Sequence, residues 1–312
     1  MSFDLTFPLV VLAAYGLCNL LLSAAVVLAW RAGLQRHLTG ADAVLGIRLL
    51  PTAGSAILVL TVVLPAFVLY EPPHAHDHPG PLLLASALFA LLVLADGARR
   101  GIGAWQATRA LLSSAQPLHT DTVAGGPEVT VINVNEPIVA VVGGWRQRIV
   151  AARCVAAACD PEEFHQVLAH EAAHLRARDN LKLLLLLTMP DALAWLPTGA
   201  ALTERWRAAT ELEADERASG CDRRKRAALA SALIKVARLS LASSRPRKLV
   251  RTAAPVTGLE HRIRRLLAPS PAERRGFPGL RVLTGALLLP LLAVPLYESV
   301  HRLIEALVAF GR

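Results

Sequence analysis

Cysteine is scarce in this sequence, and no two cysteines have the Cys-x-x-Cys spacing. Cys18 lies in an apolar run, and Cys154, Cys159 and Cys221 are typical of a reducing compartment without a disulfide framework. Internal repeats are absent. Basic residues outnumber acidic ones by 33 to 24, a net charge of +9, but no nucleic-acid-reading motif accompanies them. We therefore expect no direct contact with nucleic acid.

Charged residues are missing from long stretches of the chain. The composition is 54% hydrophobic with a mean hydropathy of +0.44, which favours a membrane protein over a soluble one. Residues 9–30 and 49–70 are uncharged and long enough to cross a bilayer. Residues 82–95 and 282–297 are shorter apolar runs, which makes about four transmembrane helices. No Lys or Arg precedes the first run, so we interpret it as an anchored span and not as a cleaved signal peptide.

The distribution of basic residues predicts a topology. The first loop holds Arg31, Arg36 and Arg48, the loop at 71–81 has no Lys or Arg, and a basic segment follows the third run. Because Lys and Arg collect on the cytoplasmic side, we expect a multi-pass protein of the cell (inner or plasma) membrane with its N-terminus outside. The predicted domains are residues 1–98 with three spans, 99–279 in the cytoplasm, and 280–312 with the last span and a short tail.

One predicted helix carries the strongest chemical signal. It begins with a capping-box pattern at Asp160 and Glu163. Inside it lies His170-Glu171-x-x-His174, and residues four apart share one face of a helix. This spacing lets both imidazoles reach one Zn²⁺, with Glu171 as the base that takes a proton from the activated water. The predicted active site is therefore on the cytoplasmic side.

A second helix pattern at 203–220 offers a third metal ligand. Glu211 and Asp215 are four residues apart and share a face. Glu211 is suited to complete the zinc site, and Asp215 to accept the other ring N–H of a ligand histidine. An exposed acidic helix face is the alternative, but the upstream motif favours one zinc per chain. The histidines of the loop at 71–81 we interpret as part of a polar turn.

The apolar segment at 181–203 separates the two helices that carry these residues. A single membrane crossing there would put Glu211 on the opposite side of the bilayer from His170, which contradicts a shared zinc site. We therefore expect this membrane-associated segment to be a hairpin, a re-entrant segment or a buried core helix.

A small sheet is predicted just before the metal-binding helix. Residues 129–134, 137–142 and 148–155 have the composition of strands. An edge strand beside the zinc of an endopeptidase can hold substrate in extended form by β-augmentation. The candidate substrate-binding strand comprises Val139, Ala140, Val141 and Val142, and a plain structural hairpin is the alternative. The predicted fold class is a mainly α membrane protein with an α+β zincin metallopeptidase domain that contains this small sheet.

Several motifs of the chain are informative when they are taken together. They are Pro137-Ile138-Val139, Gly143-Gly144, Arg148-Ile149-Val150, His170-Glu171-Ala172-Ala173-His174-Leu175-Arg176-Ala177-Arg178-Asp179-Asn180 and Glu211-x-x-x-Asp215. With them the chain resembles a known family, the membrane metallopeptidases of the beta-lactam antirepressor (BlaR/MecR) type. The resemblance implies a gluzincin with His170, His174 and Glu211 on zinc and Glu171 as base. It also implies, for members that act as sensors, cleavage of a cytoplasmic repressor that switches on transcription.

Two departures from that family stand out. About fifteen residues follow Tyr297 and no Ser-x-x-Lys nucleophile is present, so we expect the C-terminal penicillin-binding sensor domain to be lacking. Ala214 stands where the relatives often have Cys, beside intact ligand positions.

The sequence thus predicts an integral-membrane zinc-dependent endopeptidase that hydrolyses peptide bonds by metal-activated water. The expected role is regulatory, site-specific proteolysis of a cytoplasmic protein such as a transcriptional repressor. A membrane quality-control or prenyl-processing protease with the same motif is one alternative, and a catalytically silent signalling scaffold is another. The expected partners are a protein or peptide substrate and the lipid bilayer. The sequence does not decide whether the chain forms a homo-oligomer.

Overall fold

The computed structural model describes residues 3–38, 40–70, 80–114, 117–122, 128–134, 136–143, 147–242, 258–268, 298–299, 302 and 306. The chain divides into two compact units. We call Met1–Arg100, Leu186–Thr203 and Phe277–Arg312 the membrane unit, and Gly101–Leu185 with Glu204–Gly276 the second unit.

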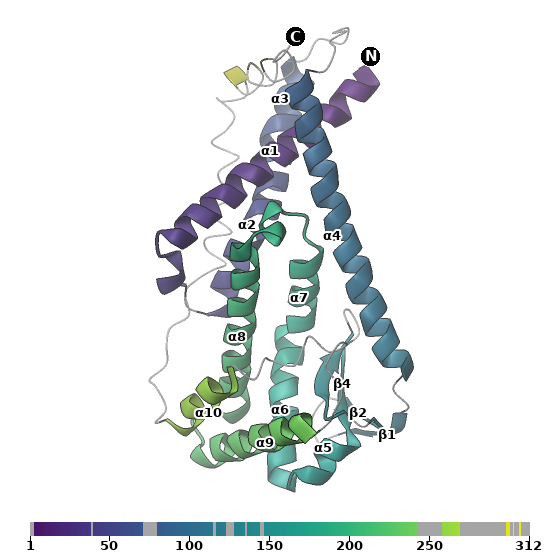
Figure 1. Ribbon diagram of the computed structural model, residues 1–312, viewed down its shortest axis with the longest axis vertical. Helices are drawn as coiled ribbons and strands as arrows, with labels where there is room; N and C mark the ends of the chain where they lie inside the picture. The colour runs from purple at the N-terminus through teal and green to yellow at the C-terminus, as the bar shows by residue number, and fades with distance from the viewer. Residues whose placement is uncertain are drawn as a thin grey trace. The chain divides into compact units, whose positions relative to one another are not determined.

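The membrane unit is built from long apolar helices (Figure 1). They are α1 (Phe3–Arg31), α2 (Ala41–Leu58), which continues through the π-helical turn η2 (Val59–Val63) into α3 (Leu64–Tyr70), and α4 (Pro81–Ser114). Three stretches, Phe7–Arg31, Ala41–Tyr70 and Pro81–Ala110, are long and apolar enough to cross a membrane. The third helix continues well past the predicted run at 82–95. The fourth predicted span, at 282–297, lies outside the described residues.

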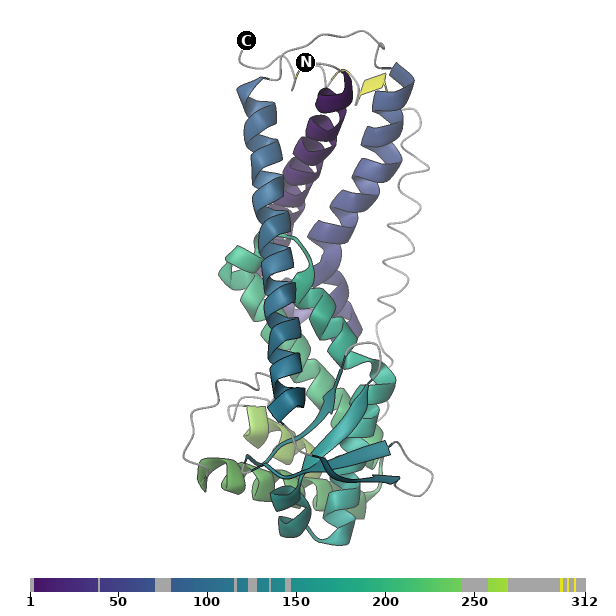
Figure 2. The same cartoon turned by 90° about the vertical axis from the view of Figure 1, so that its right-hand side faces the viewer.

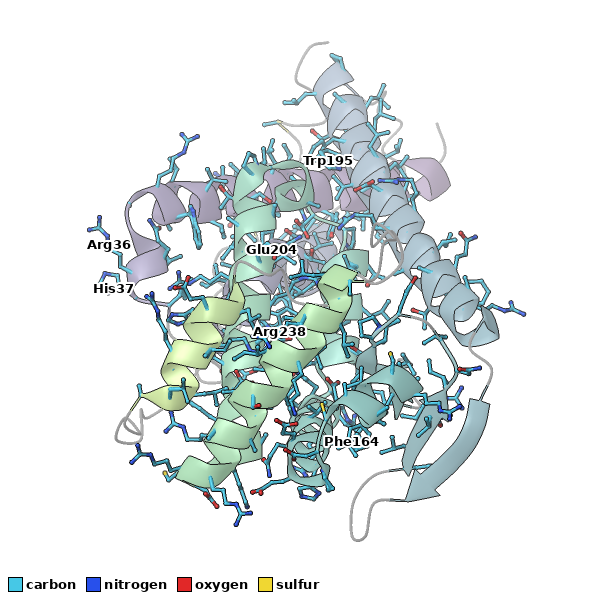
Figure 3. The ribbon with its side chains drawn as sticks, turned by 60° about the horizontal axis from the view of Figure 1, so that its bottom comes forward. Arg36, His37, Phe164, Trp195, Glu204 and Arg238 are labelled. Carbon is cyan, nitrogen blue, oxygen red and sulfur yellow. The ribbon has the colours of Figure 1, made fainter. Side chains whose placement is uncertain are left out.

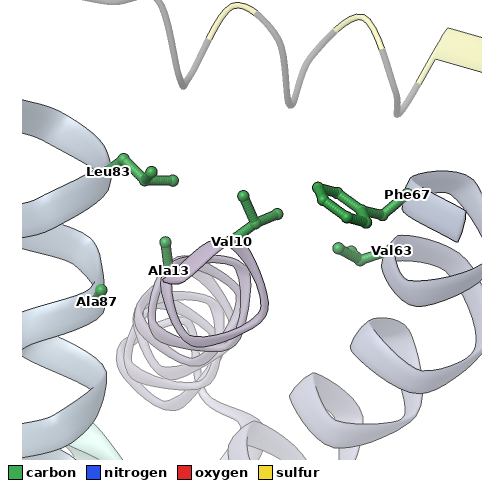
Figure 4. Packing of buried hydrophobic residues seen from close by; sticks show 6 residues of the cluster. All are labelled: Val10, Ala13, Val63, Phe67, Leu83 and Ala87. Carbon is green, nitrogen blue, oxygen red and sulfur yellow. The ribbon is translucent and has the colours of Figure 1, made fainter. Parts of the chain in front are cut away.

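Buried apolar side chains join three of these helices at one end of the membrane unit (Figure 4). Gly16 of α1 allows a close approach there, because a Cβ at this position would lie 2.6 Å from the Ser86 carbonyl oxygen of α4. Small residues at helix contacts in membranes act in this way. The cluster comprises Val10, Ala13, Val63, Phe67, Leu83 and Ala87.

The apolar segment that follows the metal-binding helix turns back within the membrane unit. The last residues of α7 (Asp179–Thr188), the short 3-10 helix η3 (Ala192–Trp195) and the first residues of α8 (Pro197–Ser219) form this turn. The Pro190 carbonyl oxygen accepts hydrogen bonds from Tyr15 Oη (2.8 Å), Asn19 Nδ2 (3.1 Å) and Thr52 Oγ1 (3.0 Å). The chain enters the unit at Leu186 and leaves it at Thr203, as a hairpin does.

The second unit contains a mixed four-stranded sheet with the strand order β1-β2-β4-β3 (Figure 2). The strands are β1 (Pro117–Thr122), β2 (Glu128–Ile132), β3 (Val139–Val142) and β4 (Arg148–Ala152). β2 and β4 are parallel, whereas β1–β2 and β3–β4 are antiparallel. β1 was not predicted, since its mixed polar composition lacks a strand pattern. The last predicted strand, at 148–155, is too long, because residues 153–155 belong to α5 (Arg153–Ala158).

Helix α6 (Pro161–Ala177) packs on strands β3 and β4. The shared core includes Ile149, Leu168 and Ala172, with Phe164 (labelled in Figure 3) packed against it. Helix α9 (Arg223–Ala242) packs against both α6 and α10 (Leu259–Leu267). The edge strand β3 and the helices α6, α8 and α10 therefore supply the side chains of the site.

The start of α6 is the capping box that the sequence predicts. The Asp160 side chain accepts the Glu163 backbone N–H at 2.9 Å, and the Glu163 side chain accepts the Asp160 N–H at 2.9 Å. The helix ends at Arg178, whose left-handed conformation (φ 54°) closes it. Both ends of α6 are thus set by residues within or directly next to the helix.

Candidate metal centre

His170 and His174 on α6 and Glu211 on α8 converge on one point. Their potential ligand atoms all lie within 4.8 Å of one another. The two Nε2 atoms are 3.1 Å apart, and Glu211 lies 3.5 Å from Nε2 of His170 and 3.7 Å from Nε2 of His174. Ligand atoms at about 2.0–2.2 Å from a tetrahedral Zn²⁺ would be separated by about 3.3–3.6 Å. The observed spacing and the donor set, two imidazoles and a carboxylate, therefore fit such an ion.

The far nitrogen of each imidazole faces a carboxylate. His170 Nδ1 lies 3.0 Å from Asp215 Oδ1, and His174 Nδ1 lies 2.8 Å from Asp179 Oδ2. A carboxylate in this place favours the tautomer that carries its proton on Nδ1 and fixes the ring orientation. Both Nε2 lone pairs then point into the same space. Two lone pairs facing each other at 3.1 Å repel, so the arrangement favours a shared cation.

Without a metal, a proton is the cation that this cluster would hold. Burial opposes protonation of His170, but its contacts with Asp215 and Glu211 outweigh burial and raise the pKa of His170 to about 10. Burial would also raise the pKa of Glu211, yet the contacts with His170 and Arg262 lower it to about 2. The carboxylate that faces the imidazoles is therefore ionised at neutral pH, as a metal ligand must be.

Glu171 lies on the sheet side of α6, where it meets the edge strand. The backbone N–H of Val141 donates a hydrogen bond to Glu171 Oε2 at 3.1 Å. The side-chain amide of Asn180 donates to the Val141 carbonyl oxygen, so both backbone groups of Val141 point away from β4 toward α6 and α7. Burial raises the pKa of Glu171 above its ordinary value. A carboxylate with a raised pKa next to a metal centre is suited to accept a proton.

Arg262 of α10 reaches into the same cluster. Its Nε and NH2 donate to the two oxygens of Asp215, at 2.8 and 2.7 Å, and its NH1 lies 2.6 Å from Glu211 Oε2. Burial would raise the pKa of Asp215, but the hydrogen bond from Arg262 and the contact with His170 lower it to about 2. Burial would lower the pKa of Arg262, but its contacts with Asp215 and Glu211 outweigh burial and raise it. The guanidinium thus keeps both carboxylates ionised in a buried place.

The structure brings together all the predicted metal-site residues, His170, Glu171, His174, Glu211 and Asp215. Glu213, on another side of α8, pairs with Arg217 at 2.7 Å. The predicted strand of Val139, Ala140, Val141 and Val142 is β3, the edge strand of the sheet. The histidine-rich loop at 71–79 lies outside the described residues.

Sequence reasoning missed three residues of this cluster. Asp179 and Asn180 belong to the motif that carried the family resemblance, but no role was derived for them. Their signal is their position directly after the metal-binding helix, within reach of its last turn. Arg262 has no such signal. It is 47 residues from Asp215 in sequence, and it belongs to a short basic helix whose pattern is typical of a solvent-exposed helix.

A solved structure and a protein family are similar to this chain. The crystal structure of S. mikatae Ste24p is similar at 16% identity and a TM-score of 0.31, covering 73% of this chain and 65% of that one. The chain thus spans about two thirds of that protein's length. No curated protein matches. The profile of the BlaR1 peptidase M56 family matches residues 101–266, which is more than half of the chain and includes every metal-site residue named above. The protein is therefore a membrane metallopeptidase that belongs to the BlaR1 peptidase M56 family.

Proposed function

We propose that the protein is a zinc endopeptidase in which His170, His174 and Glu211 hold the metal. The observation that carries this proposal is the convergence of three donor groups at distances of 3.1–3.7 Å, with both far imidazole nitrogens facing carboxylates. The same arrangement argues against a silent scaffold, because nothing in a scaffold requires it.

Zinc at this site would supply Lewis-acid activation of water and of the scissile carbonyl. Glu171 accepts a proton from the attacking water and returns it to the leaving amine. The Val141 N–H holds Oε2 of Glu171, which leaves the other carboxylate oxygen for the proton. Asp215 and Asp179 keep the imidazoles oriented throughout.

We further propose that substrate binds in extended form along the outer edge of β3. Successive residues of a strand direct their backbone groups alternately to the two sides, so Val139 faces the same way as Val141. Val141 is already engaged by Glu171 and Asn180, which leaves Val139 to pair with a peptide. Under this proposal, Val141 aligns the strand with the catalytic base and Val139 binds substrate.

The proposed biological role is regulatory cleavage of a cytoplasmic protein such as a transcriptional repressor. Membership of the BlaR1 peptidase family supports it, and so do Arg31 and Arg36 at the connection between α1 and α2, which favour a cytoplasmic site by the positive-inside rule. Arg48, which was predicted to lie in this loop, belongs to α2. The hairpin at 186–203 is compatible with a cytoplasmic site, because the chain enters and leaves the membrane unit there without a single crossing between His174 and Glu211. Reporter fusions after residue 38 and after residue 242 test the topology, and both are expected to report the cytoplasm.

The deciding experiment compares the wild type with Glu171→Gln and a matched control, Glu162→Gln. Glu162 lies on the same helix, and pairs with Arg224 at the surface. We would measure zinc content and cleavage of casein by each full-length protein in detergent. We expect one zinc per chain in all three and a loss of cleavage of about 10²–10⁴-fold in Glu171→Gln alone.

Other outcomes identify the alternatives. Absence of zinc from the wild type would refute the metal site. Zinc with equal cleavage in wild type and Glu171→Gln would refute the role of Glu171. Zinc with no cleavage in any of them would favour the scaffold, unless co-expression with a repressor yields a cleaved fragment in wild-type cells. Cleavage restricted to misfolded membrane proteins would favour a quality-control protease.

A further inference from the structure

Arg262 is a charged side chain in a place where charge is costly. It is 7% exposed, and it comes from α10, a helix of nine residues far along the chain from the metal-binding motif. A buried arginine persists only where carboxylates pair with it in good geometry. The mechanism proposed above does not use it, so its presence beside Glu211 and Asp215 needs an explanation of its own.

The guanidinium occupies a fixed position between two acids. Nε and NH2 form a fork to both oxygens of Asp215, and NH1 lies 2.6 Å from Oε2 of Glu211. NH2 also lies 3.5 Å from Nε2 of His170. Each of these acids in turn faces an imidazole: Asp215 faces Nδ1 of His170, and Oε1 of Glu211 lies 3.7 Å from His174 Nε2. Arg262 therefore contacts both acids of the metal centre and lies beside the His170 nitrogen that faces the metal position.

We infer that Arg262 is a positioning residue of the metal site, an inference that rests on the zinc site proposed above. It holds Oε2 of Glu211 and so fixes how that carboxylate faces the two imidazoles. It also holds Asp215 in the orientation that fixes the His170 ring. The rigid planar fork of arginine, which matches carboxylates in two directions at once, is suited to this task, and a lysine ammonium is not.

Charge balance gives the same assignment. Glu171, Asp179, Glu211 and Asp215 place four carboxylates around the two histidines. A divalent cation offsets two of these charges. Arg262 offsets a third, and its loss would leave Asp215, which is 3% exposed, without a cationic partner. The reorientation of Asp215 or Glu211 that follows would weaken the metal site directly.

If Arg262 only held α10 against α8, removing another ion pair between these two helices should weaken zinc binding equally. One turn away, Arg265 also connects α10 to α8 through an ion pair with Glu216, and its carbonyl oxygen accepts a hydrogen bond from Arg226 of α9. The side chains of Arg265 and Glu216 are 30% and 54% exposed, and within the described part of the chain neither is seen to pair with a metal-site residue. Arg265→Gln therefore removes a pair between the same two helices without disturbing the carboxylates of the site, and serves as a matched control.

A direct contact of Arg262 with substrate is disfavoured by its geometry. The residue is 7% exposed, and its Nε, NH1 and NH2 each contact a carboxylate oxygen of Asp215 or Glu211. Its action is therefore assigned to these two acids. A residue that acts through other side chains is a positioning residue and not a catalytic one. Substitution of Arg262 should therefore change the metal affinity even when no substrate is present.

The test measures zinc affinity of full-length Arg262→Gln, Arg262→Lys and Arg265→Gln, all in detergent and all in the Glu171→Gln background to prevent self-cleavage. A chelating dye competes for the metal, and the thermal midpoint of each metal-free protein shows whether it is folded. We expect Arg262→Gln to weaken zinc binding by about 10- to 100-fold, as loss of groups that orient metal ligands does. Arg262→Lys, which keeps the charge without the fork, should fall in between. Arg265→Gln should stay within about twofold, because an exposed pair contributes little.

Unchanged or tighter zinc binding in folded Arg262→Gln and Arg262→Lys would overturn the inference, and so would an equal loss in Arg265→Gln. If Arg262→Gln does not fold, Arg262→Lys alone decides the question. Absence of zinc from the parent protein would refute the proposed function itself. Normal zinc binding and casein cleavage in the wild type, with no effect of Arg262 substitutions, would refute only this inference.

Discussion

The backbone N–H of Val141 donates a hydrogen bond to Glu171, at 3.1 Å from N to Oε2. This contact joins the edge strand β3 to the residue of the His-Glu-x-x-His motif that faces the sheet. Asn180 completes the connection from the other side, by donating to the Val141 carbonyl oxygen. The position of the carboxylate is thereby tied to the strand on which we propose that substrate binds.

Val141→Pro removes this N–H, and we expect it to lower kcat. Proline is tolerated on an edge strand where the N–H points away from the sheet, so the fold should persist. Misplacement of a catalytic group by about 1 Å costs on the order of 10²-fold in rate. Steady-state cleavage of a peptide substrate measures the effect. Unaltered kcat in a folded Val141→Pro protein would show that the contact does not position Glu171.

Val139→Pro is the matched comparison, since it removes an N–H that faces the same edge two residues earlier. If substrate pairs with this edge, KM should rise while kcat stays near the wild-type value. An unchanged KM would remove the support for substrate binding along β3.

Metal removal should inactivate and destabilise the protein. A bound ion that recognises only the folded state stabilises it by about 2.7 kcal/mol at a free concentration of 100 Kd. Chelation should therefore lower the thermal midpoint, and zinc should restore it. His170→Ala should bind no zinc and show no such shift, whereas His165→Ala, an exposed histidine of the same helix, should behave as the wild type. Zinc stabilisation of His170→Ala to the wild-type extent would contradict the assigned site.

Glu163→Gln should destabilise the protein and change its response to acid. The Glu163 carboxylate caps α6 and accepts hydrogen bonds from Ser231 (2.6 Å) and Lys235 of α9. Burial would raise the pKa of Glu163, but the bonds from Lys235, Ser231 and Asp160 outweigh it and lower the pKa to about 2. Loss of the charged bonds should cost about 2 kcal/mol at pH 7.

The sign of the pH effect follows from this lowered pKa. A carboxylate that is more acidic in the folded state stabilises the protein fully above its unfolded pKa, about 4.3, and loses that contribution as the pH falls toward 2. Denaturant unfolding between pH 6 and pH 3 should thus show a smaller loss of stability in Glu163→Gln than in the wild type. Glu162→Gln provides the control, since its pair with Arg224 is exposed. Parallel pH curves for Glu163→Gln and wild type would contradict the assigned cause.

The buried pair of Arg48 and Asp191 should be essential to the membrane unit as a pair, and dispensable when both partners are replaced. Arg48 NH1 lies 2.7 Å from Asp191 Oδ2, and both side chains are almost fully buried. Arg48→Met leaves a buried carboxylate without its partner, which typically costs about 3–5 kcal/mol. Asp191→Asn keeps an acceptor for the Ala194 N–H.

Thermal unfolding in detergent compares Arg48→Met with the double variant Arg48→Met/Asp191→Asn, which should recover most of the stability. Arg99→Met, which removes an exposed partner of Asp96, should change the stability by less than about 1 kcal/mol. A double variant no more stable than Arg48→Met would show that the buried charge is not the cause.

Much of the architecture follows from local patterns, because it depends on residues close together in sequence. The three long apolar helices of the membrane unit are predicted by uncharged runs, and β2, β3 and β4 by strand composition. By contrast, β1 is polar and exists through backbone pairing with β2, which composition does not reveal. The last predicted strand was too long, since its apolar residues continue into α5 without a turn signal.

The residues of the candidate site also fall into those that local sequence predicts and those that tertiary packing brings in. The sequence by itself determined the capping box that starts α6, the placement of His170 and His174 on one face, and the shared face of Glu211 and Asp215, because helical periodicity acts over four residues. Only the tertiary structure decided that Val141 meets Glu171, that Asp179 meets His174, and that Arg262 joins Glu211 to Asp215. The physical reason is that these contacts depend on how a strand, a helix end and a distant helix pack around α6, and packing is set by the whole core.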